Sequence, residues 1–157
     1  DVYKRQIDIY SGTEMDILPD GTLDYDNVVL AQLDYVIAAI HQSFNQSEKE
    51  IMKRLEVACK NPYVRHIAHP TGRIIGRRQG YKTNIEKLIQ LAEETNTFLE
   101  INSNPNRLDL NTEIVRKYSN VKLTINTDAH HTDHLEFMKY GVATAQKGFV
   151  NLSLIHI

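Results

Sequence analysis

The stretch VKLTINTDAHHTDH, residues 121 to 134, changes from apolar alternation to a cluster of acids and histidines. From Val121 to Asn126 apolar and polar residues alternate, a period of two that predicts a β-strand. Asp128 and His130 follow it, so both side chains can point into one cavity beyond the strand's end. A carboxylate with an imidazole suits Zn²⁺, Mn²⁺ or Fe²⁺. Alternatively, Asp128 caps a helix that begins near Asp133, and His130 is a surface side chain.

Length and composition indicate one compact domain. The chain has 157 residues, of which 41% are hydrophobic, enough for a sizeable core. The net charge is −2, so any surface that binds nucleic acid must be local. A single cysteine, Cys59, cannot form an internal disulfide and fits a reducing compartment. No apolar run approaches the ~18 residues of a membrane span and no signal peptide is visible, so we expect a cytoplasmic protein without membrane association.

Both ends of the chain depart from this pattern. DVYKRQ, residues 1–6, is what GAT GTG TAT AAG AGA CAG encodes, and LSLIHI, residues 152–157, is what the reverse complement of that sequence encodes. This oligonucleotide is the transposon end used to prepare sequencing libraries. We therefore expect both segments to be adapter read-through, which leaves residues 7–151 as a domain cut at both sides.

Strand-like and helix-like segments alternate along the chain. Ser47 with Glu50, and Thr83 with Glu86, form two predicted capping boxes that start helices. Further helices are predicted after Asp26, from Asn111 or Thr112, and from His134 onward. Strands are predicted over residues 7–16, 35–41, 64–69, 97–102 and 121–126. This alternation with short connections predicts parallel βαβ units, and hence an α/β fold.

Acidic or imidazole side chains recur where the predicted strands end. In α/β barrels the C-terminal ends of the strands converge on one face, where functional sites are built. We therefore expect a divalent-metal site from Glu14, His41, His69, Asp128 and His130. Each of these residues taken alone could equally be a surface or capping residue.

A basic loop follows the strand that ends at His69. The loop TGRIIGRRQGYK, residues 71–82, carries Arg73, Arg77 and Arg78, whose guanidinium groups could bind phosphate oxygens bidentately. Arg107, at another strand end, could do the same or could pair with Asp109. The alternative is that these side chains are solvated on a surface loop and bind no phosphate.

Six motifs carry a resemblance to a known family. They are GTEMDIL (12–18), DGTLDY (20–25), AIHQSF (39–44), NPYVRHIAHPTGR (61–73), LEINSNPNRLDL (99–110) and TDAHHTDHLEFMKYGVATAQKG (127–148). Together they resemble the PHP (polymerase and histidinol phosphatase) domain, and within it the C-terminal PHP domain of bacterial family X DNA polymerases. The resemblance covers nearly all of residues 7–151, in order.

The resemblance implies a distorted (βα)₇ barrel with up to three divalent ions, Mn²⁺ or Zn²⁺. It implies 3′–5′ exonuclease and related processing of DNA 3′ ends. By position, Glu14 matches the bridging carboxylate, His41 and His69 match histidine ligands, and Asp128 with His130 matches the final DxH pair. Glu14, Asp128 and His130 are the expected catalytic groups, and all five are expected ligands.

The chain departs from the family pattern in what lies before residue 7. The family's HxH motif with its aspartate, and a further histidine, belong upstream, so we expect a partial barrel without its first strands and no exonuclease activity from the chain as written. Two alternatives remain. The parent protein could be a stand-alone phosphatase for a small monoester such as histidinol phosphate, or a degenerate PHP module with only a structural or metal-binding role.

Overall fold

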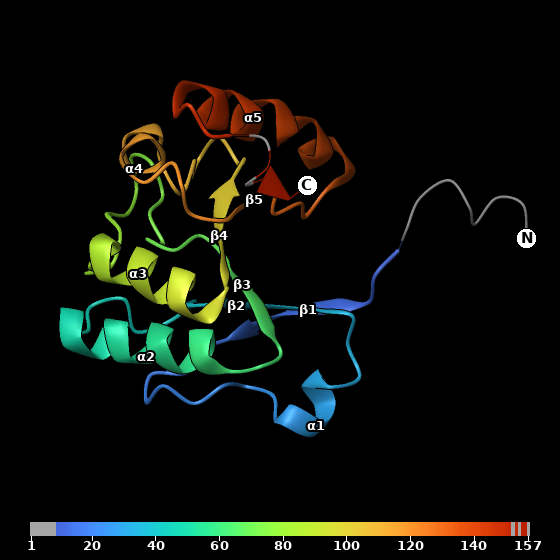
Figure 1. The fold of residues 1–157 in the computed structure, drawn as a ribbon, viewed down its shortest axis with the longest axis vertical. Coiled ribbons are helices and arrows are strands. Elements are labelled where there is room, and N and C mark those ends of the chain that lie inside the picture. The colour runs from blue at the N-terminus through green and yellow to red at the C-terminus, as the bar shows by residue number, and fades with distance from the viewer. Residues whose placement is uncertain (1–8, 152, 154, 157) are drawn as a thin grey trace, which may run out of the picture.

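The computed structural model describes residues 9–151, 153, 155 and 156 (Figure 1). The strands are β1 (Gly12–Asp16), β2 (Tyr35–Ala39), β3 (Val64–Ile67), β4 (Phe98–Asn102), β5 (Leu123–Asn126) and β6 (Ile155–His156). The helices are α1 (Asn27–Leu30), α2 (Glu48–Lys60), α3 (Ile85–Thr95), α4 (Thr112–Lys117) and α5 (Met138–Lys147), with a 3₁₀ helix, η2, over Thr132–Phe137. The predicted alternation of strands and helices is confirmed.

The strands formed by the described residues belong to one sheet, in the order in which they occur along the chain. The order is β1-β2-β3-β4-β5-β6, and every neighbouring pair is parallel. A doubly wound sheet would reverse its order at a switch point, whereas sequential order is that of an α/β barrel. Right-handed crossovers then put the helices on one face, and α2, α3, α4 and α5 lie around the outside of the strands (Figure 1). The fold is an α/β fold compatible with part of a PHP barrel.

The strand alternation separates an apolar outer face from an inner face that carries both polar and apolar side chains. One row of registered partners crosses five strands under the helices, and each member is at most 1% exposed: Met15, Ala38, Ile67, Leu99 and Leu123. Burying each large apolar side chain of this kind contributes about 1.5–3 kcal/mol. The adjacent registered row, on the inner face, carries Glu14, Ile37, His66 and Phe98, so Glu14 and His66 lie on alternate strands of the same face.

The helix starts agree with the sequence at most positions. The capping box of Ser47 and Glu50 is present. The second predicted box is wrong: Asn84 caps α3 by accepting from the Lys87 backbone N–H at 3.1 Å, while the Thr83 hydroxyl donates to the Pro70 carbonyl at 3.2 Å. Thr83 is thus occupied by the preceding loop, and its neighbour takes the capping role.

The last helical region differs from expectation in its first turns. The region begins as the 3₁₀ helix η2, and its N-cap is His131, whose ring accepts from the Asp133 backbone N–H at 3.3 Å. The α-helix α5 begins only at Met138. Asp128 therefore does not cap this region.

Helix α5 lies directly on the ends of β4 and β5, and Gly141 makes this approach possible. A Cβ atom at Gly141 would lie 2.0 Å from Ser103 Oγ and 2.5 Å from Ile125 Cγ2. We expect Gly141→Ala to lower the free energy of unfolding by about 1–3 kcal/mol through overpacking, despite the better helix propensity of alanine. Urea unfolding followed by circular dichroism measures this change. Gln146→Ala on the exposed side of α5 is the control, and equal midpoints for both variants would contradict the close packing.

The expectation for the two ends stays a prediction. Residues 1–6 lie outside the described residues, as do 152, 154 and 157. The described Ile155 and His156 form the two-residue strand β6 beside β5. Within the described part of the chain, none of the helices has the length and apolar character needed to cross a membrane.

Candidate metal centre

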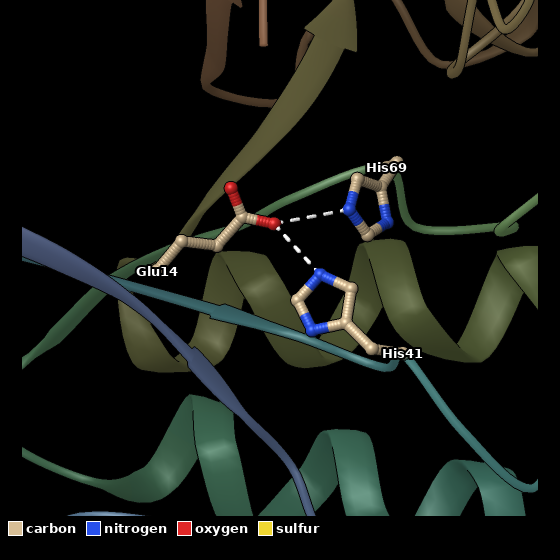
Figure 2. Close-up of side chains that lie close together, drawn as sticks. All are labelled: Glu14, His41 and His69. Atoms are coloured by element: carbon tan, nitrogen blue, oxygen red, sulfur yellow. Dashed lines mark hydrogen bonds and ion pairs between the residues drawn. The ribbon is translucent and has the colours of Figure 1, made fainter. Parts of the chain in front are cut away.

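Three of the predicted ligands converge at the carboxyl edge of the sheet (Figure 2). Glu14 lies on β1, while His41 and His69 each follow the end of a neighbouring parallel strand. Glu14 Oε1 lies 3.0 Å from His41 Nε2 and 3.1 Å from His69 Nε2. The three ligand atoms all lie within 4.8 Å of one another. A carboxylate oxygen with two imidazole nitrogens is a donor set that fits Zn²⁺ or Mn²⁺.

The backbone at His69 is held in an unusual conformation. His69 has a φ of 30°, which is uncommon for a residue with a side chain, and its side chain is 2% exposed. Its N–H donates to Glu100 Oε2 at 2.5 Å, and its carbonyl accepts from the Tyr81 hydroxyl at 3.3 Å. Such conformations cost about 1–3 kcal/mol and persist where surrounding contacts enforce them. Here the contacts from Glu100 and Tyr81 fix the imidazole beside Glu14.

Asp16 is not among the predicted ligands, but it orients the ring of His41. Its carboxylate contacts His41 Nδ1, so the other ring nitrogen of His41 is the one that faces Glu14. A carboxylate behind a ligand histidine fixes the ring and its tautomer in many metal sites. The signal was available, since Asp16 lies two residues after Glu14 and therefore on the same face of β1.

The histidines determine the charge state of the cluster. Partial burial would raise the pKa of Glu14, but contacts with His41 and His69 hold that pKa well below its ordinary value. The hydrogen bond to Glu14 raises the pKa of His41, and the contact with Asp16 adds to this rise. Without metal, the Glu14 carboxylate is therefore ionised, and the His41 imidazole keeps its proton to a higher pH than an ordinary histidine. A divalent ion would displace that proton when it binds.

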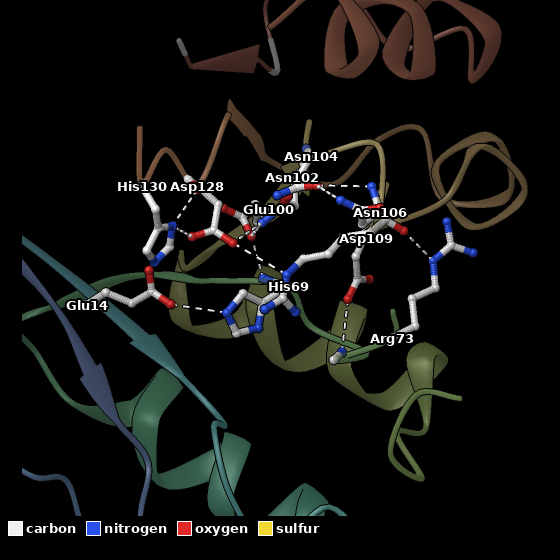
Figure 3. A network of polar contacts seen from close by, with 12 residues as sticks. Glu14, His69, Arg73, Glu100, Asn102, Asn104, Asn106, Asp109, Asp128 and His130 are labelled. Carbon is white, nitrogen blue, oxygen red and sulfur yellow. Dashed lines mark hydrogen bonds and ion pairs between the residues drawn. The ribbon is translucent and has the colours of Figure 1, made fainter. Parts of the chain in front are cut away.

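Asp128 and His130 lie at the same edge of the sheet, beyond β5 (Figure 3). Asp128 Oδ2 accepts from Asn102 Nδ2 at 3.2 Å, and Asp128 has a φ of 50°. His130 Nδ1 lies 3.6 Å from Asp128 Oδ1, but the His130 side chain is 79% exposed. Neither residue belongs to the close group that Glu14 forms with the histidines. The structure thus brings three of the five predicted ligands together, and leaves the other two on the neighbouring part of the same edge.

Glu100 and Asn102 connect the two parts of the edge. Glu100 Oε2 accepts from the His69 N–H, and also from Asn102 Nδ2 at 3.1 Å. Burial would raise the pKa of Glu100, but the nearby His66 and the His69 N–H lower it below its ordinary value. A 2% exposed carboxylate is therefore kept ionised under the site. Sequence reasoning missed both residues, although they alternate on β4 as inner-face residues do.

Arg73 and Arg107, two of the four predicted phosphate-binding arginines, contact neighbouring loop residues in the structure. Arg73 donates through Nε to the Arg107 carbonyl at 2.7 Å and through a terminal nitrogen to the Leu108 carbonyl at 2.5 Å. Arg107 Nε lies 3.4 Å from Asp128 Oδ2, so its acidic partner is Asp128. The alternative pairing with Asp109 is wrong, because Arg107 is directed to Asp128; one Asp109 oxygen instead accepts the backbone N–H groups of Thr71 and Gly72 at 3.0 and 2.9 Å.

The other two arginines lie on the loop between β3 and α3. Arg77 is exposed within a short antiparallel turn that joins Ile74 to Arg78. Arg78 donates from Nε to the Gly72 carbonyl at 3.0 Å, and its guanidinium carbon lies 4.0 Å from the centre of the Phe44 ring. No phosphate contact follows from these positions alone, and all four phosphate roles stay predictions.

Two kinds of known protein are similar to this chain. No family model matches the chain. The DNA polymerase/3'-5' exonuclease PolX of Bacillus subtilis (strain 168) is 61% identical over 143 residues, which are 90% of this chain and 25% of that protein. A probable phosphatase of Thermoanaerobacter sp. (strain X514) is 32% identical over 136 residues, which are 79% of this chain and 53% of that protein. The chain thus spans about a quarter of PolX and about half of the phosphatase.

A parallel, sequentially ordered sheet with a carboxylate and two imidazoles grouped at its carboxyl edge defines an α/β domain with a candidate metal site. The chain belongs to the PHP family, in the branch found in bacterial family X DNA polymerases. The resemblance carried by its motifs is confirmed.

Proposed function

We propose that this segment is the hydrolytic domain of a bacterial family X DNA polymerase, where it removes nucleotides from DNA 3′ ends with the help of divalent metal ions. The observation that carries the proposal is the Glu14 carboxylate placed between two histidine Nε2 atoms at 3.0 and 3.1 Å. The 61% identity to a protein named as a 3'-5' exonuclease supports the choice of substrate.

In this proposal Glu14, His41 and His69 hold one divalent ion, and Asp128 with His130 contributes to a neighbouring position. Mn²⁺ or Zn²⁺, up to three ions in the full-length protein, would lower the pKa of bound water and neutralise the phosphate oxygens. The Irving–Williams order favours Zn²⁺ by affinity alone. Glu14, Asp128 and His130 are the proposed catalytic groups.

The surrounding residues keep these ligands in place. Asp16 fixes the ring of His41, and Glu100 fixes the backbone of His69. Arg77 and Arg78 are proposed to contact substrate phosphate. Arg107 is proposed to do so beside Asp128, and Arg73 to support that loop through its carbonyl contacts.

A second function is favoured by the relatives named as probable phosphatases. The same ligand set could hydrolyse a small phosphate monoester, such as histidinol phosphate, if the full-length protein lacked a DNA-binding part. The leading proposal is preferred because the identity to PolX is 61% and that to the phosphatase is 32%.

The test uses the full-length protein that contains this segment. With Mn²⁺ we expect stepwise shortening of a 5′-labelled single-stranded oligonucleotide from its 3′ end, and complete loss of shortening with EDTA. Histidinol phosphate is the competing substrate, and the 157-residue chain assayed alone is expected to be inactive. Preferential hydrolysis of histidinol phosphate would favour the phosphatase. Inactivity on both substrates would favour the degenerate module.

A further inference from the structure

An open pocket lies beside the metal centre, between the loops that follow β2 and β3. It has a volume of about 1100 Å³ and is lined by residues 43–46 and 78–82. Ser43 is two residues from His41, and the hydroxyl of Tyr81 donates to the His69 carbonyl at 3.3 Å. The pocket walls are therefore connected directly to the two histidines of the metal centre.

A stack of two aromatic rings and a guanidinium group forms one part of this pocket. The Phe44 and Tyr81 rings are nearly parallel, at 4°, with centroids 6.1 Å apart. The guanidinium carbon of Arg78 lies 4.0 Å from the Phe44 centroid. Arg78 is held by its bond to the Gly72 carbonyl, and Tyr81 is 6% exposed. The stack is thus built from fixed groups, and Phe44 and Arg78 are only partly buried.

The charge around the pocket favours an anion. A second open pocket of about 640 Å³, lined by residues 73–80, shares Arg78, Gln79 and Gly80 with the first. The residues that line the two pockets include four cations and no carboxylate: Arg73, Arg77, Arg78 and Lys82. This contrasts with the chain's net charge of −2. A basic groove with a flat aromatic group is what single-stranded nucleic acid requires, because the groove attracts phosphates and the ring stacks with a base.

A second aromatic series on the same edge is less suitable. The rings of His134 and Phe137 are stacked with centroids 4.9 Å apart. Exposed Asp133 and Glu136 lie on the same segment, and they would repel a phosphate backbone.

We propose that the pocket between residues 43–46 and 78–82 is a nucleotide subsite for single-stranded DNA. The base of one nucleotide close to the 3′ end stacks against the group formed by Phe44 and Arg78, and the adjoining phosphates lie along the strip of Arg77, Arg78 and Lys82. The subsite rests on the proposed function, since it positions a strand whose terminal phosphodiester lies at the metal centre. The subsite predicts that the rate of hydrolysis depends on the presence of a base at one fixed distance from the scissile phosphodiester.

Photocrosslinking of the full-length protein tests binding without requiring hydrolysis. The probes are single-stranded oligothymidylates that each carry one 5-iodo-deoxyuridine, placed at successive positions from the 3′ end. Crosslinking is done in EDTA, and crosslinked peptides are identified by mass spectrometry. We expect crosslinks to the peptide containing Phe44 or Tyr81, and their loss at Phe44 in Phe44→Leu, which keeps an apolar side chain. Crosslinks confined to other peptides, at every probe position, would overturn the subsite.

Abasic substitution tests the same subsite during turnover and needs no protein variant. The wild-type protein is assayed with Mn²⁺ on strands with one abasic nucleotide at successive positions from the 3′ end. We expect kcat/KM to fall roughly 10-fold at one position only, the size of effect expected when one base–aromatic stack is lost. In Phe44→Leu this position effect should disappear, while Lys60→Ala, a charge removed from the far end of α2, should keep it. Equal rates at every position would contradict the subsite.

The two experiments separate this inference from the proposed function. Crosslinks at Phe44 without any hydrolysis would support the subsite and contradict the exonuclease assignment. Hydrolysis at equal rates on intact and abasic strands, with no crosslink at Phe44 or Tyr81, would support the exonuclease assignment and contradict the subsite.

Discussion

Replacing Glu14 by glutamine in the full-length protein should lower metal-dependent hydrolysis of single-stranded DNA by roughly 10³-fold or more, because an anionic group at the reacting centre is removed. The amide keeps the size of the side chain but has no negative charge and only one oxygen. Glu14 Oε1 is the atom that both histidine nitrogens approach, so the variant removes the charge that the two histidines share. The measurement is kcat/KM on a 5′-labelled oligonucleotide, together with the content of bound metal after dialysis against Mn²⁺ or Zn²⁺.

Asp16→Asn is the matched control for this variant. It also replaces a carboxylate by an amide on β1, but Asp16 lies behind His41, where it contacts Nδ1 of the ring and accepts from Gln42 Nε2 at 3.5 Å. Loss of such a supporting carboxylate typically costs 10–100-fold in metal affinity or activity, and excess Mn²⁺ should restore most of the activity. Wild-type activity in Glu14→Gln, with normal metal content, would show that this cluster is not the metal centre.

The features predicted well from the sequence are those determined by local pattern and by strand order. Short apolar runs and apolar alternation located the strands, and a parallel sheet necessarily brings neighbouring strand ends together. The convergence of Glu14, His41 and His69 follows from these facts, since β1, β2 and β3 are adjacent. Their distances could not be predicted, because they depend on the backbone conformation at His69, which contacts from distant residues maintain.

The features that were missed depend on register between distant segments. Glu100 and Asn102 look like ordinary members of a strand, and only the sheet shows that they lie between His69 and Asp128. The acidic partner of Arg107 was ambiguous for the same reason. Asp109 is close in sequence, but its carboxylate already accepts backbone N–H groups from the preceding loop.

A buried arginine supports the strand-end loops on which the site depends. Arg54 of α2 is 1% exposed. It donates to the Gln42 carbonyl at 3.1 Å, to Gln46 Oε1 at 2.7 Å and to the Ile17 carbonyl. Burial lowers the pKa of Arg54, and its hydrogen bonds offset the cost of removing the charge from water. One side chain therefore joins the chain after β1 to the loop that begins beside His41.

We expect Arg54→Met to lower the free energy of unfolding by about 3 kcal/mol, because hydrogen bonds to a charged group contribute about 1.5–3 kcal/mol each and relief of the buried charge offsets part of the loss. For a chain of this size the midpoint of thermal unfolding should fall by roughly 6–12 °C. Circular dichroism during heating measures it. Arg65→Met, at an exposed position of β3, is the matched control and should change stability by less than about 0.5 kcal/mol.

The same variant also reports on the site, because Gln42 and Gln46 flank the loop that carries Phe44. Methionine fills most of the space of Arg54 but gives these acceptors no donor, so the loop should loosen and the position of His41 should become less defined. In the full-length protein we therefore expect reduced hydrolysis of DNA even below the new midpoint of unfolding. Stability equal to or greater than wild type would show instead that the cost of burying the guanidinium exceeds the contribution of its hydrogen bonds.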